Sequence, residues 1–291
     1  MELKKIIVTG SNGQLGNELK DLQDFYPQFR FIFFNRDVLS INDEKAIQKV
    51  LEIQKPDYLI NCAAYTAVDN AESEKEKAEE INGTAVGKLA LACSQYLTKF
   101  IHISTDYVFN GKQNVPLKET DHVDPVNTYG ETKLSGERLA FQNNPDSLII
   151  RTSWVYSSYG KNFVKTMIRL MKERDKINVV NDQWGSPTYA ADLAGTILQI
   201  IVSEKWVPGI YNFSNDGVIT WFDFAKEIKR LRNSTCTIEP ITTDQFPTAA
   251  KRPNYSVLDK SKIQQVYQIQ LKDWEKSLQT CIAKLESSTI L

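Results

Sequence analysis

Thr105, Tyr129 and Lys133 are the residues of this chain whose types and spacing most directly suggest chemistry. Tyr129 and Lys133 stand four positions apart, so on a helix they share one face and the ammonium can lie near the phenol. A nearby cation favours the phenolate and brings the phenol pKa, ordinarily about 10, toward the working range. Thr105 follows the apolar run 100–104 and can offer a hydroxyl to the same substrate oxygen. The trio predicts a proton-transfer site, although Tyr-x-x-x-Lys also occurs by chance on helices.

A glycine-rich turn near the N-terminus supports a catalytic role for this trio. The apolar run 5–9 predicts a buried strand, and Gly10, Gly13 and Gly16 follow it at the start of a helical pattern. Glycines there permit a tight turn and let backbone N–H groups at the helix N-terminus approach a pyrophosphate. The turn therefore predicts dinucleotide binding. Its spacing is more similar to extended short-chain dehydrogenases than to the G-x-G-x-x-G of other Rossmann enzymes.

Arg36 stands where a Rossmann unit meets the adenosine ribose, about 20 positions after the glycine turn. An acidic residue would bind the free ribose hydroxyls and repel a 2′-phosphate, whereas arginine can bind that phosphate with paired donors. This favours NADPH and leaves NADH open as an alternative. A lone arginine after a strand is also commonly just exposed.

The alternation of strands and helices predicts an α/β fold. Apolar runs at 5–9, 29–34, 58–61, 100–104 and 148–152 alternate with helical patterns that start near 14, 43, 74 and 128. We predict a Rossmann-type doubly wound parallel sheet with a smaller interwoven substrate-binding domain. Residues 1–152 form the predicted NADP(H)-binding domain, with 186–205 returning to it, and 153–291 form mainly the second domain. Thr105 and the small residues Ala63 and Ala64 follow predicted strands, at the sheet edge where ligands bind.

Composition excludes several function classes. The 291 residues include 35 basic and 36 acidic side chains, a net charge of −1, so no global field favours nucleic acid or a membrane. No stretch has the length of a membrane span or a signal-peptide core, and we expect a cytoplasmic protein. The four cysteines are scattered and only two histidines are present, so neither a disulfide framework nor a zinc site is expected.

Motifs along the whole chain resemble the dTDP-4-dehydrorhamnose reductase family. Besides the glycine turn and Tyr129-Gly-Glu-Thr-Lys133, they are Asn61-Cys-Ala-Ala-Tyr-Thr, Ser104-Thr-Asp-Tyr-Val-Phe109, Arg151-Thr-Ser-Trp-Val-Tyr156 and Asp182-Gln-x-Gly-x-Pro-Thr188. The resemblance implies that NADPH transfers a hydride to C4 of a dTDP-bound 4-keto-6-deoxyhexose, which gives dTDP-L-rhamnose. It also implies that residues 153–291 bind the sugar nucleotide.

The resemblance assigns roles to individual residues. Tyr129 would protonate the 4-oxygen, Lys133 would bind the nicotinamide ribose and tune Tyr129, and Thr105 would orient the substrate oxygen. The implied substrate contacts are Val68, Thr105, Asp106 and Trp154, and Lys251 and Arg252 lie where relatives reach the nucleotide diphosphate. The implied cofactor contacts are Gly10, Asn12, Gly13, Gln14, Leu15, Gly16, Arg36, Ser40, Ile41, Ala63, Ala64, Tyr65, Thr66, Tyr129 and Lys133.

The chain departs from the family pattern at two places. Ser40 stands where many members carry an aspartate against the adenine, so adenine recognition is expected to be weaker or rearranged. Some members are magnesium-linked dimers, and Asp192 and Glu286 match their acidic ligands only incompletely. We therefore predict no metal and leave a homodimer open.

Two other functions remain compatible with the sequence. A sugar-nucleotide epimerase or dehydratase uses similar apparatus but retains NAD, and Arg36 and the lack of a glutamate after Asp106 count against it. A non-catalytic subunit similar to the regulatory subunit of methionine adenosyltransferase would share the fold, but the intact trio of Thr105, Tyr129 and Lys133 argues against it.

Overall fold

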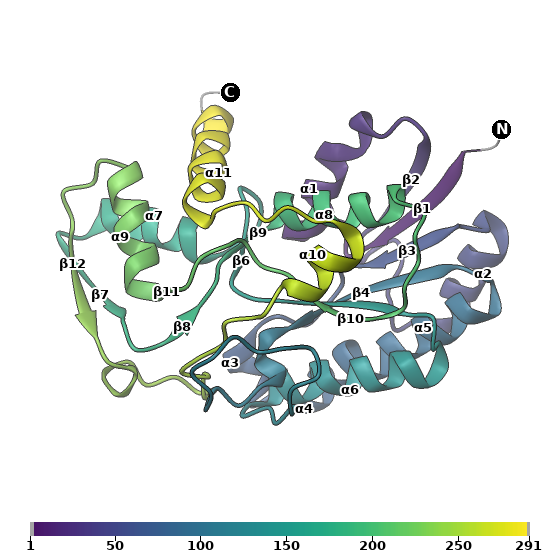
Figure 1. The fold of residues 1–291 in the computed structure, drawn as a ribbon, viewed down its shortest axis with the longest axis horizontal. Helices are drawn as coiled ribbons and strands as arrows, with labels where there is room; N and C mark the ends of the chain where they lie inside the picture. The colour runs from purple at the N-terminus through teal and green to yellow at the C-terminus, as the bar shows by residue number, and fades with distance from the viewer. Residues whose placement is uncertain (1–2, 290–291) are drawn as a thin grey trace.

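A six-stranded parallel sheet forms the centre of the molecule in the computed structural model, which describes residues 3–289 (Figure 1). The strand order is β10-β5-β4-β3-β1-β2. The strands are β1 (Lys4–Thr9), β2 (Phe29–Phe34), β3 (Tyr58–Asn61), β4 (Lys99–Thr105), β5 (Leu148–Thr152) and β10 (Gly209–Asn212). The order reverses at β1, which pairs with both β2 and β3. This topology confirms the predicted doubly wound α/β fold and places a ligand crevice at the carboxyl ends of β1 and β3.

Alternating strand residues bury their side chains in two different cores, one on each face of the sheet. Ile6 and Val8 pack with α1 (Gln14–Leu22), α8 (Ala190–Val202) and α10 (Ser261–Tyr267). Ile7 packs on the opposite face with α2 (Glu44–Gln54), α5 (Ala85–Gln95) and α6 (Thr128–Asn143). The strands are apolar on both sides because helices cover both faces, as in parallel sheets generally. The shorter helices α3 (Val68–Ala71) and α4 (Lys75–Glu79) lie against α6.

A second lobe lies beside the carboxyl edge of the sheet (Figure 1). It contains α7 (Phe163–Glu173), α9 (Trp221–Leu231) and α11 (Trp274–Thr289), whose apolar faces share one core. Short strand pairs complete it: β7 (Lys176–Val180) with β12 (Thr237–Ile241), β8 (Trp184–Gly185) with β11 (Ile219–Thr220), and β6 (Val155–Tyr156) with β9 (Thr188–Tyr189). α8, α10 and β10 belong to the second half of the sequence but pack on the central sheet, so the two parts are interwoven.

The part of the chain that the structure describes has neither a helix able to span a membrane nor a cluster of metal-binding side chains. Within residues 3–289 no helix combines the length and the apolar character that crossing a bilayer requires. In the same range, no three His, Cys, Asp or Glu side chains gather in a way that could hold a metal ion.

Candidate active site

The glycine turn joins β1 to α1 with almost no space beside its backbone. Gly10 has φ +66°, and a Cβ there would lie 2.5 Å from the backbone nitrogen of Ala63. A Cβ on Gly16 would lie 2.5 Å from the Cα of Ser11. Side chains are therefore excluded at both positions, and the backbone at the start of α1 stays open to a ligand.

A pocket of about 290 Å³ opens at this turn. Eight of the predicted cofactor residues line it: Gly10, Asn12, Gly13, Arg36, Ser40, Ile41, Ala63 and Ala64. Asn35, Asp37, Leu39, Asn42, Cys62 and Ile81 complete the lining. Of these, Asn42 could have been expected from its place two residues after Ser40, whereas Ile81 has no local sequence signal. The pocket therefore joins the glycine turn and the N-terminus of α1, which are the features that bind the phosphates of a dinucleotide in this type of fold.

The other predicted cofactor contacts lie outside this lining. Gln14 donates to the carbonyl of Val155 at 3.4 Å and accepts from Asn162 at 2.9 Å, so it joins α1 to the second lobe. Leu15 packs in the core, and Gly16 lies against Ser11. Tyr65 exchanges backbone hydrogen bonds with the Asn82 side chain, and Thr66 is exposed.

Helix α6 presents Tyr129 and Lys133 from a firmly anchored N-terminus. Asn127 caps the helix by accepting from the backbone N–H of Gly130 at 2.8 Å. Glu72 accepts from the backbone N–H of Thr128 at 2.8 Å and from its hydroxyl at 3.1 Å. A Cβ on Gly130 would lie 2.2 Å from the carbonyl oxygen of Tyr107, so the helix start packs directly on the segment that follows β4. These contacts hold Tyr129 opposite the end of β4.

The end of β4 brings Thr105 and Asp106 together below Tyr129. The Thr105 hydroxyl donates to Asp106 Oδ1 at 3.0 Å and accepts from the backbone N–H of Tyr107 at 3.1 Å. Both side chains are buried, and burial raises the pKa of the Asp106 carboxyl to about 7. Ser256 lies close enough to the Asp106 carboxyl to lower its pKa, but Asp106 Oδ2 is buried without a well-aligned hydrogen bond among the described residues, so it can receive a ligand hydroxyl.

Burial also raises the pKa of the Tyr129 phenol, and the Asp106 carboxylate raises it further, whereas the Thr105 hydroxyl lowers it. The sequence predicted a shift in the opposite direction, caused by Lys133. Lys133 instead turns to β4, where its ammonium nitrogen lies 2.6 Å from the carbonyl oxygen of Ile103 and 3.2 Å from His102 Nε2. The side chain is 1% exposed, and burial lowers the pKa of Lys133 to about 8. Desolvation is therefore the largest cause of the pKa shift of both Tyr129 and Lys133.

Trp154 lies after β5 with a left-handed backbone, φ +48°. Its ring stacks on Trp221, with centroids 3.6 Å apart and planes 13° from parallel. A Cβ on Gly185 would lie 2.6 Å from the Trp154 ring, which is therefore held between Gly185 and Trp221. The sequence predicted Trp154 as a site residue but gave no signal for Trp221, because their approach depends on the second lobe.

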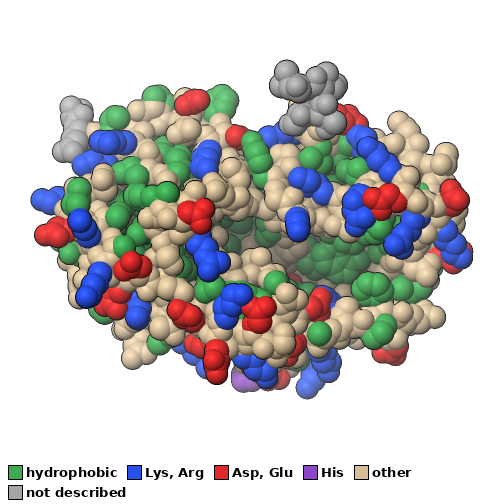
Figure 2. All heavy atoms as spheres, turned by 180° about the vertical axis from the view of Figure 1, so that it is seen from behind, with side chains coloured by type: hydrophobic (Ala, Val, Ile, Leu, Met, Phe, Trp, Pro, Cys, Tyr) green, Lys and Arg blue, Asp and Glu red, His purple; other side chains and the backbone are tan. Residues whose placement is uncertain are grey.

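A second pocket of about 230 Å³ adjoins this pair of tryptophans. It is lined by Phe163, Met167, Asn178, Val179, Val180, Gln183, Trp221, Phe246, Thr248 and Arg252. Figure 2 shows the molecule hollowed on this side, with hydrophobic side chains gathered in the hollow. Arg252 forms a bidentate ion pair with Asp69, at 3.0 and 2.7 Å, just after Val68 at the start of α3. This pair joins the two lobes, and Lys251 beside it is exposed.

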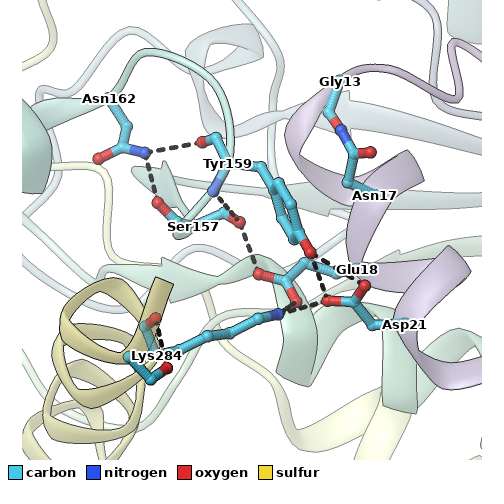
Figure 3. Close-up of polar contacts among 9 residues, drawn as sticks. Gly13, Asn17, Glu18, Asp21, Ser157, Tyr159, Asn162 and Lys284 are labelled. Atoms are coloured by element: carbon cyan, nitrogen blue, oxygen red, sulfur yellow. Dashed lines mark hydrogen bonds and ion pairs between the residues drawn. The ribbon is translucent and has the colours of Figure 1, made fainter. Parts of the chain in front are cut away.

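A polar cluster fixes the helix that follows the glycine turn (Figure 3). Glu18 of α1 is 1% exposed and accepts from Ser157 at 2.5 Å and from Lys284 of α11 at 2.6 Å. Lys284 also pairs with Asp21, which accepts from the hydroxyl of Tyr159. The cluster ties the first and last helices of the chain together, and so holds the second lobe against the cofactor pocket.

Known proteins of one family are similar to this chain along nearly its whole length. The family described as RmlD substrate binding domain matches residues 4–287. The chain is 40% identical to a dTDP-4-dehydrorhamnose reductase of Aggregatibacter actinomycetemcomitans, over 98% of this chain and 100% of the relative. The crystal structure of a dTDP-4-dehydrorhamnose reductase from Bacillus anthracis in complex with NADP is similar with a TM-score of 0.93 at 38% identity, over 97% of this chain and 100% of that one. A crystal structure of such a reductase from Clostridium acetobutylicum has a TM-score of 0.92 at 40% identity, over 97% and 99%. With a shared fold and similarity along nearly its whole length, the chain belongs to the dTDP-4-dehydrorhamnose reductase family.

Proposed function

We propose that this protein reduces the C4 ketone of dTDP-4-dehydro-L-rhamnose to the alcohol of dTDP-L-rhamnose, with NADPH as the hydride donor. The observation that supports this most directly is the convergence of Thr105, Asp106 and Tyr129 at the carboxyl end of β4. The reduced nicotinamide supplies the hydride, and the residues of the chain supply binding, orientation and the proton.

The pocket at the glycine turn fits the cofactor. Gly10 and Gly13 line it without side chains, so a pyrophosphate can approach the N-terminus of α1 closely. Arg36 lines the same pocket with a guanidinium suited to the 2′-phosphate of NADPH. Ser40 and Ile41 line its far side, where we place the adenine. In this proposal residues 1–152 bind the cofactor and residues 153–291 bind most of the sugar nucleotide.

Tyr129 acts as the proton donor. A ketone that gains a hydride develops negative charge on oxygen and needs a proton there, so the acid must arrive protonated. The raised pKa of the Tyr129 phenol keeps it protonated at neutral pH. When Asp106 is protonated it can donate to the Thr105 hydroxyl, which frees the Thr105 hydrogen to bind the substrate oxygen and fix its orientation. Lys133 completes the site by binding the nicotinamide ribose.

The second lobe supplies the surfaces for the sugar nucleotide. The stacked pair Trp154 and Trp221 offers an apolar wall of the kind that a deoxysugar face contacts. Val68 begins α3, next to the Asp69–Arg252 pair. Arg252, which is paired with Asp69, lines the second pocket, and the exposed Lys251 precedes it in the chain. We assign both cations to the diphosphate.

The Tyr129→Phe variant tests this function. Removing the phenolic hydroxyl removes the proton donor but leaves the ring, so turnover of dTDP-4-dehydro-L-rhamnose should fall at least ~100-fold while NADPH affinity stays the same. The measurement is the loss of reduced-nicotinamide absorbance, with NADPH and NADH compared in parallel. Turnover near that of the unmodified protein would refute the role of Tyr129.

The same assay separates this function from its alternatives. Oxidation of NADPH by the purified chain alone, with the keto sugar and no partner protein, excludes a purely regulatory subunit. A retained-cofactor epimerase or dehydratase would instead copurify with stoichiometric NAD and consume no added NADPH.

A further inference from the structure

His102 is a buried imidazole that the proposed reaction does not use. It lies on β4 with no exposed surface, and its ring is nearly parallel to that of Phe100 at 6.1 Å. Its Nδ1 lies 3.0 Å from Asn61 Nδ2, and its Nε2 lies 3.2 Å from Lys133 Nζ. The ring therefore connects the end of β3 to the lysine of the candidate active site.

The proton on this ring can be placed from the groups around Asn61. The backbone N–H of Ala63 lies 3.1 Å from Asn61 Oδ1 and can only donate, so this atom must be the amide oxygen. The Thr9 hydroxyl donates to the same oxygen at 2.7 Å. Asn61 Nδ2 thus faces His102 as a donor, and Nδ1 of the ring must accept. A neutral ring then carries its hydrogen on Nε2.

This tautomer distinguishes between the two protonation states of Lys133. A neutral amine accepts the Nε2 hydrogen with its lone pair and donates one N–H to the Ile103 carbonyl at 2.6 Å, so the ring N–H, the lone pair and the carbonyl are all paired. An ammonium at the same place would face the His102 N–H with another donor. The contact therefore favours the neutral amine.

We infer that His102 is a positioning residue for Lys133. The Nε2 hydrogen of His102 holds the neutral amine of Lys133 against β4. Protonation of that amine breaks this hydrogen bond and releases the lysine toward Tyr129 and the cofactor ribose. The inference rests on the proposed role of Lys133. It gives the buried ring a function in setting the charge and place of a cofactor-binding group.

The other ionisable groups near Lys133 are consistent with a lysine that titrates in the working range. Burial lowers the pKa of Lys133 to about 8, and Glu137, one turn along α6, raises it. The Glu137 carboxylate is itself paired with Arg151 of β5 at 2.7 Å. Tyr129 lies one turn earlier on α6, and Asp106 follows β4. Burial and the nearby Lys133 lower the pKa of His102, so the ring stays neutral.

The tautomer can be measured directly in the unmodified protein. The chain contains two histidines, and His122 is exposed, so ¹⁵N-labelled imidazoles give two readily distinguished sets of signals. We expect His102 to show a protonated Nε2 and an unprotonated Nδ1 at neutral pH. A protonated Nδ1 would refute the inference, and this measurement needs neither substrate nor a variant.

The His102→Phe variant tests the effect on Lys133. The unmodified protein should lose NADPH affinity as pH rises through the pKa of Lys133, because the neutral amine binds the ribose less well. Loss of the Nε2 donor should move this decline upward by about one pH unit, a tenfold change in proton affinity. The Phe100→Leu variant disturbs packing around the ring without removing a hydrogen bond, and it should leave the decline unmoved.

The measurements test the positioning role of His102 separately from the proposed reductase function. A decline that stays in place or moves downward in His102→Phe would refute the positioning role. NADPH binding can be followed without the keto sugar, so absence of reductase activity would refute the proposed function and leave the His102 result interpretable. If His102→Phe does not fold, the tautomer measurement still decides the inference.

Discussion

The buried ion pair between Arg151 and Glu137 offers a stringent test of how the sheet holds α6. Both side chains are 2% exposed, and Arg151 donates to the two carboxylate oxygens at 2.9 and 2.7 Å. Removing one partner leaves the other charge buried, which typically destabilises a protein by about 3–5 kcal/mol. Arg151 keeps a contact with the carbonyl of Glu119 at 3.4 Å and lies over the Phe109 ring. The destabilisation should therefore be near the lower end of this range for Glu137→Leu, which leaves Arg151 with these contacts. It should be near the upper end for Arg151→Met.

The double variant Arg151→Met/Glu137→Leu distinguishes the cost of an unpaired buried charge from the cost of lost packing. If the cost of each single change comes from an unpaired buried charge, the double variant should be less destabilised than either single variant. The assay is urea unfolding followed by circular dichroism, with the unfolding slope checked for constancy. Glu204→Gln removes an exposed pair with Lys4 and should leave the midpoint unchanged. This reasoning would be refuted if the unfolding free energy of the double variant fell by the sum of the two single decreases.

Two further predictions concern other buried carboxylates. Because burial raises the pKa of Asp106 from 3.8 to about 7, the folded state holds its proton more tightly, and stability is lost as pH rises between these values. The unfolding free energy of Asp106→Asn should therefore equal that of the unmodified protein near pH 4. Above pH 8 it should be higher by up to about 4 kcal/mol. A difference that does not change with pH would contradict this prediction. Lys284→Met should destabilise the protein by about 2 kcal/mol, because Glu18 is 1% exposed and loses its cation; the cost is below that of the Arg151–Glu137 pair because Lys284 is itself 30% exposed. A calorimetric scan measures this, and Glu18→Gln added to Lys284→Met should restore part of the loss.

Much of the fold was predictable because it depends on local signals. The predicted strands 29–34, 58–61 and 148–152 coincide with β2, β3 and β5, since short apolar runs between helical patterns indicate buried parallel strands. β10 was missed, because four residues that begin with glycine carry little periodicity and become a strand only by pairing with β5. The packing of α10 on the central sheet was not predicted, because its apolar residues could equally have joined the other core.

The sequence by itself determined which residue types stand at the carboxyl ends of the strands, because strand length and glycine spacing are local properties. Thr105, Tyr129 and Lys133 could be named as a group on that basis, as could the glycine turn. The tertiary structure decided what each of them contacts. Lys133 reaches His102 because α6 packs on β4, and Trp154 meets Trp221 because the second lobe folds back on β5. Pairings of this kind join residues 31 or more positions apart. They depend on strand register and helix packing, which no local pattern specifies.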